Sequence, residues 1–172
     1  MSNFTATTGK CKSSGVTSLE YFMKLALDQA QQAFERGETP IGCVIVKNDR
    51  VMVQSFNTRE HDKSPLAHAE IKALLEATKI QGDWRLNDHT LYVTLEPCPM
   101  CLGALLQARV GHLIFGCTDE KRQMTSDQVF PSLKNRVQIT DSNYKLSITG
   151  GILAEESSQL IKRFFKERRI NP

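Results

Sequence analysis

Apolar and polar positions alternate along the chain in a way that predicts a succession of helices and strands. Apolar residues recur at helical spacing after Thr17 and Glu20, a capping-box pair, until Gly37 ends the first helix. Short apolar runs between turn residues predict strands at residues 41–46, 51–56, 91–95 and 113–117, with weaker candidates at 137–139 and 145–148. Helical spacing returns at about residues 66–77, 98–108 and 155–169.

This order of elements favours an α/β fold, with three layers (α/β/α) around a mixed central sheet. With 172 residues the chain is long enough for one domain with its own core, which we expect over residues 17–172. We expect residues 1–16, rich in serine and threonine without an apolar run, to be a disordered tail, the alternative being a targeting segment. Residues 118–136 have a weak pattern that allows one short helix.

Composition and charge exclude some classes of protein. The chain is 40% hydrophobic and 24% charged, which excludes wholesale disorder. No apolar run approaches the roughly 20 residues that span a bilayer, so we expect no membrane segment. The net charge of +3 permits a nucleic-acid partner without requiring one.

The five cysteines indicate a reducing compartment, because their number is odd and no secretory signal precedes them. We therefore expect a cytoplasmic protein. Cys43 and Cys117 lie in apolar runs and are predicted to be small buried core residues. Cys98 and Cys101 are three residues apart at a predicted helix start, which is metal-ligand spacing.

One histidine can complete a metal site with these two cysteines. Ser64 and Pro65 predict a helix start that places His68 in the first helical turn. One imidazole and two thiolates favour zinc, and three protein ligands are typical of a catalytic zinc with its fourth position left for water or a further ligand. The other histidines are predicted to be ordinary core or surface residues: His61, His89 and His112.

Glu70 follows His68 by two residues, a poor spacing for two ligands of one ion on a helix. Its carboxylate can instead lie beside the water at the metal and move protons there.

The pattern His68-Ala69-Glu70 followed by Pro97-Cys98-Pro99-Met100-Cys101 resembles the zinc-dependent cytidine deaminase superfamily. The resemblance implies a cytidine deaminase-like fold, one zinc ion per chain and hydrolytic deamination of a base. It implies His68, Cys98 and Cys101 as ligands, and Glu70 as the group that protonates first the ring nitrogen and then the departing ammonia.

Within that superfamily the sequence looks most like the bacterial adenosine deaminases that form inosine at the wobble position of transfer RNA. The segments that carry this likeness are 38–42, 68–71, 91–98, 115–116 and 151–153, with the basic end of the chain. The likeness implies that Asn57 binds the target base and Asp119 approaches a flanking sugar. It also implies a homodimer and an anticodon stem-loop as substrate, with Ile41 and Leu95 as candidate pocket walls.

The basic residues near the C-terminus allow two interpretations. Lys166, Arg168 and Arg169 can contact phosphates, or they can complement the dipole of a helix that begins with acidic residues. The sequence also departs from the transfer-RNA branch. Residues 120–124 lack the glycine-rich stretch, 64–66 read Ser-Pro-Leu, and 141–149 look like an insertion. Two alternatives therefore stay open: a deaminase of free guanine or cytosine, and a zinc-stabilised RNA-binding subunit without turnover.

Overall fold

The computed structural model describes residues 17–119 and 144–170. Over these residues the chain forms, in order, α1 (Ser18–Glu35), β1 (Gly42–Lys47), β2 (Arg50–Phe56), α2 (Ala69–Gln81), β3 (His89–Leu95), α3 (Pro99–Gln107), β4 (His112–Cys117), β5 (Ser147–Thr149) and α5 (Ala154–Ile170). Several sequence predictions fall outside the described residues. They are the strand at 137–139, the tail at 1–16 with Cys11, and the short helix allowed within 118–136, of which only residues 118 and 119 are described.

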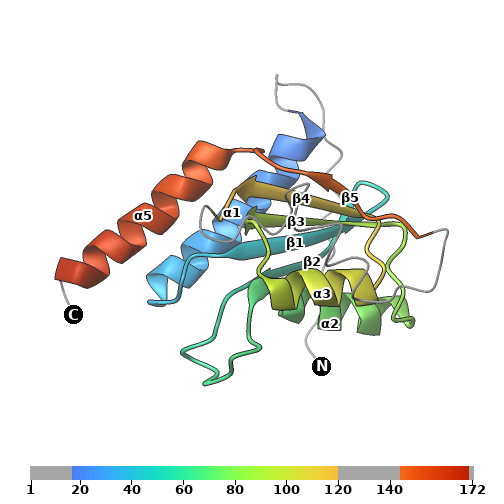
Figure 1. The fold of residues 1–172 in the computed structure, drawn as a ribbon, viewed down its shortest axis with the longest axis horizontal. Coiled ribbons are helices and arrows are strands. Elements are labelled where there is room, and N and C mark those ends of the chain that lie inside the picture. Colours follow the sequence, from blue (N-terminus) through green and yellow to red (C-terminus); the bar gives the residue numbers. More distant parts are fainter. Residues whose placement is uncertain (1–16, 120–143, 171–172) are drawn as a thin grey trace, which may run out of the picture.

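The five strands form one mixed sheet in the order β2-β1-β3-β4-β5 (Figure 1). β1 is antiparallel to β2 and to β3, whereas β3, β4 and β5 are parallel to one another. The pairing aligns Gly42 with Phe56 and Cys43 with Val93, so β1 begins at the end of the sheet where β2 and β3 finish. This confirms the predicted α/β class with a mixed sheet.

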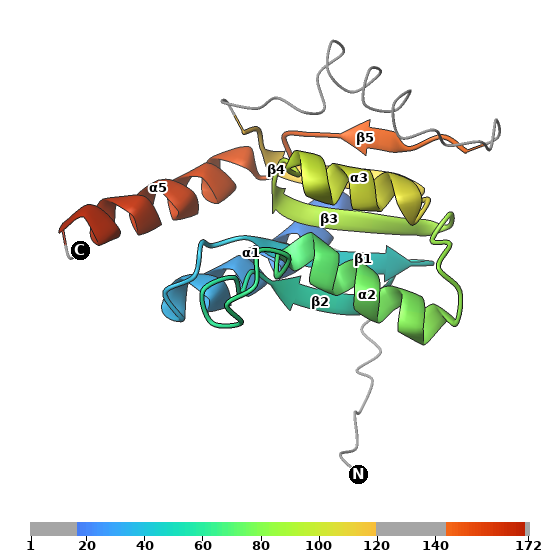
Figure 2. The same cartoon turned by 60° about the horizontal axis from the view of Figure 1, so that its bottom comes forward.

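Helices cover both faces of the sheet. α2 and α3 lie side by side on one face, and α1 lies on the other (Figure 2). Alternate residues of β1 divide between the two resulting cores: Cys43 and Ile45 pack under α2 and α3, while Val44 and Val46 pack against α1. α5 packs on the α1 side, where Phe164 meets Phe34 with ring centroids 5.6 Å apart. The predicted three layers are thus present.

Two local features fix α1 against the sheet. The predicted capping box is present, with Thr17 N donating to Glu20 Oε2 at 3.0 Å and Glu20 N donating to Thr17 Oγ1 at 3.2 Å. Gly42, the first residue of β1, lies so close to α1 that a Cβ atom there would overlap the Ala26 carbonyl oxygen. The missing side chain therefore permits the helix to approach the start of β1.

The start of α2 differs from the prediction. The helix begins at Ala69, not at 66, and its N-cap is His68. Ser64 does not cap it, because the Ser64 carbonyl accepts a hydrogen bond from Ala67 N at 3.2 Å and its hydroxyl accepts one from Leu66 N at 3.3 Å. The Ser-Pro signal thus makes a separate turn, and His68 precedes the first helical turn instead of lying in it.

The remaining differences are at element ends. α2 continues to Gln81, beyond the predicted 77, and stops where Gly82 takes a left-handed conformation with φ of 71°. The weak strand predicted at 145–148 is observed as Ser147–Thr149. Within the described residues, no helix combines the length and the apolar character needed to cross a membrane.

Candidate metal centre

The candidate site lies at one end of the sheet, where the chain leaves β2 at Phe56 and β3 at Leu95. Each exit leads into a helix on the same face, α2 after the first and α3 after the second. The starts of these two helices therefore meet above neighbouring strands, although 30 residues separate His68 from Cys98.

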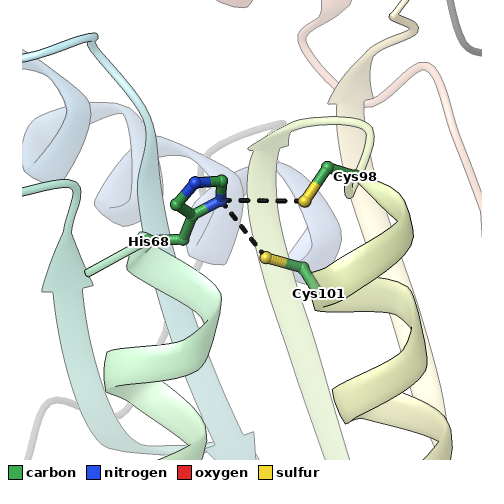
Figure 3. A group of neighbouring side chains, drawn as sticks. All are labelled: His68, Cys98 and Cys101. Carbon is green, nitrogen blue, oxygen red and sulfur yellow. Dashed lines mark hydrogen bonds between the residues drawn. The ribbon is translucent and has the colours of Figure 1, made fainter. Parts of the chain in front are cut away.

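His68, Cys98 and Cys101 point toward one another from the starts of α2 and α3 (Figure 3). The His68 Nδ1 atom lies 3.7 Å from Cys98 Sγ and 3.4 Å from Cys101 Sγ. One potential ligand atom from each residue lies within 4.8 Å of the others, close enough for all three to reach one ion. The structure thus brings together the three ligands predicted from the sequence.

Local backbone geometry explains this convergence. His68 and Cys98 are both N-cap residues in extended conformation, and neither side chain caps its own helix. Pro99 begins α3, which places Cys101 within its first turn and on the same side as Cys98. Both N-cap side chains are therefore free to face the gap between the helices, and the set of one imidazole and two sulfurs fits zinc.

The electrostatics of the cluster favour a thiolate. Hydrogen bonds with Cys101 and with His68 lower the pKa of Cys98 to about 3, although burial opposes the shift. The hydrogen bond with Cys98 also raises the pKa of His68, and the same pairing with Cys98, together with burial, raises the pKa of Cys101. A Cys98 thiolate at neutral pH is the protonation state that a metal ligand requires.

Glu70 lies beside this cluster in the first turn of α2 and is only 3% exposed. Burial raises the pKa of its carboxyl group, and Cys98 adds a smaller repulsion in the same direction. Within the described residues the buried Glu70 Oε2 has no hydrogen-bond partner. Buried oxygens are normally paired, so this unpaired oxygen points to a role other than stabilising the fold.

Asn57 directly follows β2 and is held by both its backbone and its side chain. Its backbone N donates to Ile41 O at 3.0 Å, and its Nδ2 donates to Glu38 Oε2 at 3.1 Å. Glu38 is buried, and sequence reasoning assigned it no role of its own. Its partner lies 19 residues away, and no spacing rule connects residues of two different loops.

The other predicted substrate residues occupy the same end of the sheet. Ile41 lies just before β1 and packs on the core beneath α2 and α3, and Leu95 is the last residue of β3. Both are partly buried. Asp119 follows β4, and its backbone N donates to Oε2 of the buried Glu96 at 2.9 Å, which ties the exit of β4 to the exit of β3.

Lys166, Arg168 and Arg169 lie on α5, and all three are exposed. The Arg168 guanidinium lies 5.2 Å from the Phe164 ring centroid, and Arg169 Nε donates to Phe165 O at 3.2 Å. α5 packs against α1, β3 and β4, whereas the His68–Cys98–Cys101 cluster lies at the starts of α2 and α3. The three basic residues form a separate basic surface on the layer opposite α2 and α3.

The two remaining described cysteines differ from each other. Cys43 is fully buried in the core, as predicted. Cys117 is only partly buried, because it lies at the end of β4, where its Sγ donates to Thr94 O at 3.6 Å.

Comparisons with known proteins agree with this geometry. The sequence model of the MafB19-like deaminase family matches residues 17–169. A tRNA-specific adenosine deaminase of Bacillus subtilis (strain 168) is 40% identical over 154 residues, covering 90% of this chain and 92% of that protein. One of Streptococcus pyogenes serotype M1 is 38% identical over 152 residues, covering 87% and 84%.

Solved structures give the same picture of the fold. A chain from a study of A-to-I editing by tRNA:A34 deaminases at the wobble position superimposes with a TM-score of 0.71 at 38% identity, covering 81% of this chain and 98% of that one. A guanine deaminase from Nitrosomonas europaea superimposes with a TM-score of 0.70 at 18% identity, covering 84% and 83%. The second likeness shows the shared fold alone.

Proposed function

Because the chain belongs to the MafB19-like deaminase family, we propose that it is a zinc-dependent hydrolytic deaminase that converts adenosine to inosine at the wobble position of tRNA. The observation that carries the proposal is the convergence of His68, Cys98 and Cys101 beside the buried, unpaired Oε2 of Glu70. The relatives that are 38–40% identical over most of their length support adenosine in tRNA as the substrate.

His68 Nδ1 and the Sγ atoms of Cys98 and Cys101 would hold one zinc ion. A bound zinc ion lowers the pKa of water and so supplies the nucleophile for hydrolysis at neutral pH. Glu70 moves the protons in two rounds. Its carboxylate takes one proton from the attacking water and delivers it to the ring nitrogen, then takes the second proton from the same oxygen and delivers it to the departing amino group. Water and adenosine are consumed, and inosine and ammonia are released. Burial raises the pKa of Glu70, which favours a carboxyl group that holds a proton between the two transfers.

Asn57, Ile41 and Leu95 would position the base. All three lie at the end of the sheet where the ligands meet, Asn57 offering a polar amide and the other two apolar surface. An anticodon loop presents bases that are already partly unstacked, which lowers the free-energy cost of moving the target base into a pocket. Asp119 would approach the sugar of a flanking nucleotide.

The basic surface of Lys166, Arg168 and Arg169 would contact RNA phosphates away from the reacting base. Replacing all three with glutamine should raise KM for an anticodon stem-loop by about 10-fold or more and leave kcat nearly unchanged, because phosphate contacts contribute affinity. Lys79→Gln removes an exposed charge from α2 and is the matched control. An unchanged KM in the triple variant would favour the helix-dipole interpretation.

The decisive experiment compares substrates. Purified protein is incubated with an anticodon stem-loop carrying adenosine at the wobble position, and separately with free adenine, guanine and cytosine, while inosine and ammonia are measured. We expect inosine from the RNA alone, with a rate that falls as salt concentration rises. Glu70→Ala should retain zinc and lose turnover.

Other outcomes select the alternatives. Ammonia from free guanine or cytosine, insensitive to salt, would make the chain a free-base deaminase. Bound zinc and RNA affinity without ammonia from any candidate would make it an RNA-binding subunit.

Three further parts of the proposal rest on the sequence. They are a single domain over residues 17–172 preceded by a tail at 1–16, a homodimer, and a cytoplasmic location. Sedimentation velocity of the full chain at micromolar concentration tests whether it forms a homodimer.

A further inference from the structure

We propose that Glu38 is a positioning residue for the deamination: its carboxylate fixes the orientation of the Asn57 amide that faces the target base. This inference rests on the proposed function, because it takes Asn57 as the residue that binds the base. It concerns a side chain that lies between two loops and accepts hydrogen bonds from Asn57, Glu60 and His61.

The Glu38 carboxylate is 1% exposed and accepts hydrogen bonds from three donors. Asn57 Nδ2 and Glu60 N donate to its Oε2 at 3.1 and 3.3 Å, and His61 N donates to its Oε1 at 2.8 Å. All three donors belong to the loop that links β2 to α2. One buried carboxylate therefore joins the end of α1 to the loop that leads to His68.

The position of Glu38 is itself fixed by the end of α1. Glu38 N donates to Ala33 O at 3.0 Å, directly after Gly37 turns the chain in a left-handed conformation with φ of 74°. Asn57 N is fixed in turn through Ile41 O. The backbones on both sides of the Glu38–Asn57 hydrogen bond are thus held in place independently of it.

A carboxylate can only accept hydrogen bonds, so it admits one orientation of a neighbouring amide. The nitrogen of Asn57 must face Glu38, and the amide oxygen must point away. The opposite orientation would set two buried acceptor oxygens against each other, which costs the desolvation free energy of both. Glu38 therefore determines which end of Asn57 is presented to a base.

A purely structural role for Glu38 makes a different prediction. If the carboxylate only holds the loop backbone, Glu38→Gln lowers stability but the folded fraction turns over normally. If it orients Asn57, the folded variant also reacts more slowly. Phosphate contacts dominate RNA affinity, so the loss should fall on kcat and leave KM for the RNA almost unchanged.

The first experiment measures kcat and KM for the anticodon stem-loop in full-length, zinc-loaded Glu38→Gln, with folding checked by circular dichroism. We expect kcat to fall about 10- to 100-fold, because a small misplacement of a group that positions the substrate lowers the rate by about this factor. KM should change by less than about 2-fold. If Glu38→Gln does not fold, Glu38→Asp replaces it. A normal kcat in the folded variant would overturn the proposal.

Asp62→Asn is the matched control in the same loop. Asp62 is exposed and accepts a hydrogen bond from Thr58 Oγ1 at 2.6 Å, so its loss loosens the loop without changing any contact of Asn57. Its kcat should stay within about 2-fold of the wild-type value. An equal loss of kcat in Asp62→Asn would mean that loop rigidity alone matters.

A double-mutant cycle tests whether Glu38 acts through Asn57. In the Asn57→Ala background, adding Glu38→Gln should change kcat by less than about 2-fold, because the group that it orients is already gone. Losses that multiply in the double variant would show that Glu38 acts independently of Asn57, and would contradict the proposal.

The closing measurement needs no substrate and so separates this inference from the proposed function. The side-chain amide resonance of Asn57 is identified in the nitrogen-15 spectrum by its loss in Asn57→Ala. One of its two protons should be shifted downfield and slow to exchange, and Glu38→Ala, which removes the acceptor, should abolish both properties. An unchanged resonance would refute the orienting contact. Wild-type protein that forms no inosine would instead refute the proposed function.

Discussion

Two buried glutamates at the same end of the sheet differ in how completely their carboxylate oxygens are hydrogen-bonded. Glu38 is 1% exposed, and its carboxylate accepts three hydrogen bonds. Glu70 is 3% exposed, and its Oε2 has no hydrogen-bond partner within the described part of the chain. The two side chains are therefore buried to a similar extent, and they differ in the hydrogen bonding of their carboxylate oxygens. Full pairing holds a loop in place, whereas an unpaired buried oxygen stays available for proton transfer.

Removing a candidate metal ligand should have the largest effect, because the zinc ion would supply the activated water from which Glu70 takes a proton. Cys101→Ala should leave well below one zinc per chain and no measurable turnover. Cys43→Ala replaces another fully buried cysteine, located in the core, and should retain one zinc per chain and normal turnover. Zinc content by atomic emission and inosine formation are the measurements. Full zinc content in Cys101→Ala would remove Cys101 from the ligand set.

Glu70→Gln should lower kcat by about 10²- to 10⁴-fold, the usual contribution of a proton-transfer group. The amide has the same shape as the carboxylate and cannot carry the proton. Zinc content should be unchanged, which separates this variant from Cys101→Ala. A kcat loss no larger than that of Glu38→Gln would abolish the distinction between the two glutamates.

Stability should rank the same two variants in the reverse order. Glu38→Gln replaces a charged acceptor of three hydrogen bonds and should lower the free energy of unfolding by about 1–3 kcal/mol. Glu70→Gln replaces a carboxyl group whose Oε2 is unpaired, and should change the free energy of unfolding by less than about 0.5 kcal/mol. Urea unfolding of both zinc-loaded variants measures the difference. Equal destabilisation would mean that Glu70 is also a structural residue.

A buried histidine at the opposite end of the sheet extends the comparison to pH. Burial lowers the pKa of His89, although Asp88 Oδ1, 2.9 Å from His89 Nδ1, opposes the shift. Below the unfolded pKa of about 6.5, the unfolded chain then binds more protons than the folded one. Stability should fall as pH decreases from about 6.5, by at most about 1.4 kcal/mol per pH unit for one proton.

His89→Gln should flatten this part of the stability profile, and His112→Gln, at an exposed position of β4, should not. Urea unfolding at pH 5 to 8 is the measurement. A profile that keeps its slope in His89→Gln would assign it to other groups.

The order of helices and strands was predictable because the apolar spacing changes from helical to strand-like at each boundary. The cluster of His68, Cys98 and Cys101 was predictable because these residues stand in local patterns that do not depend on the fold. The start of α2 was not predictable, because Ser64 and Pro65 satisfy the rules for a helix start and also the rules for the turn that they form in the structure. Only hydrogen bonds from other loop residues decide between the two.

Glu38 was the main omission in the site. Its residue type and its place before Thr39 and Pro40 are ordinary for a loop, and nothing local marks it as buried. The three donors that surround it are 19 to 23 residues away along the chain. A contact of this kind depends on how two loops meet, which is a property of the folded sheet.

The separation of the candidate ligands along the sequence has a consequence for assembly. Residues 30 and 33 positions apart share one cluster, so an ion there would act as a cross-link that closes a chain loop containing α2 and β3. Such a cross-link can form only after both helix starts have docked on the sheet. Metal uptake during refolding would therefore mark the moment at which this half of the molecule is complete.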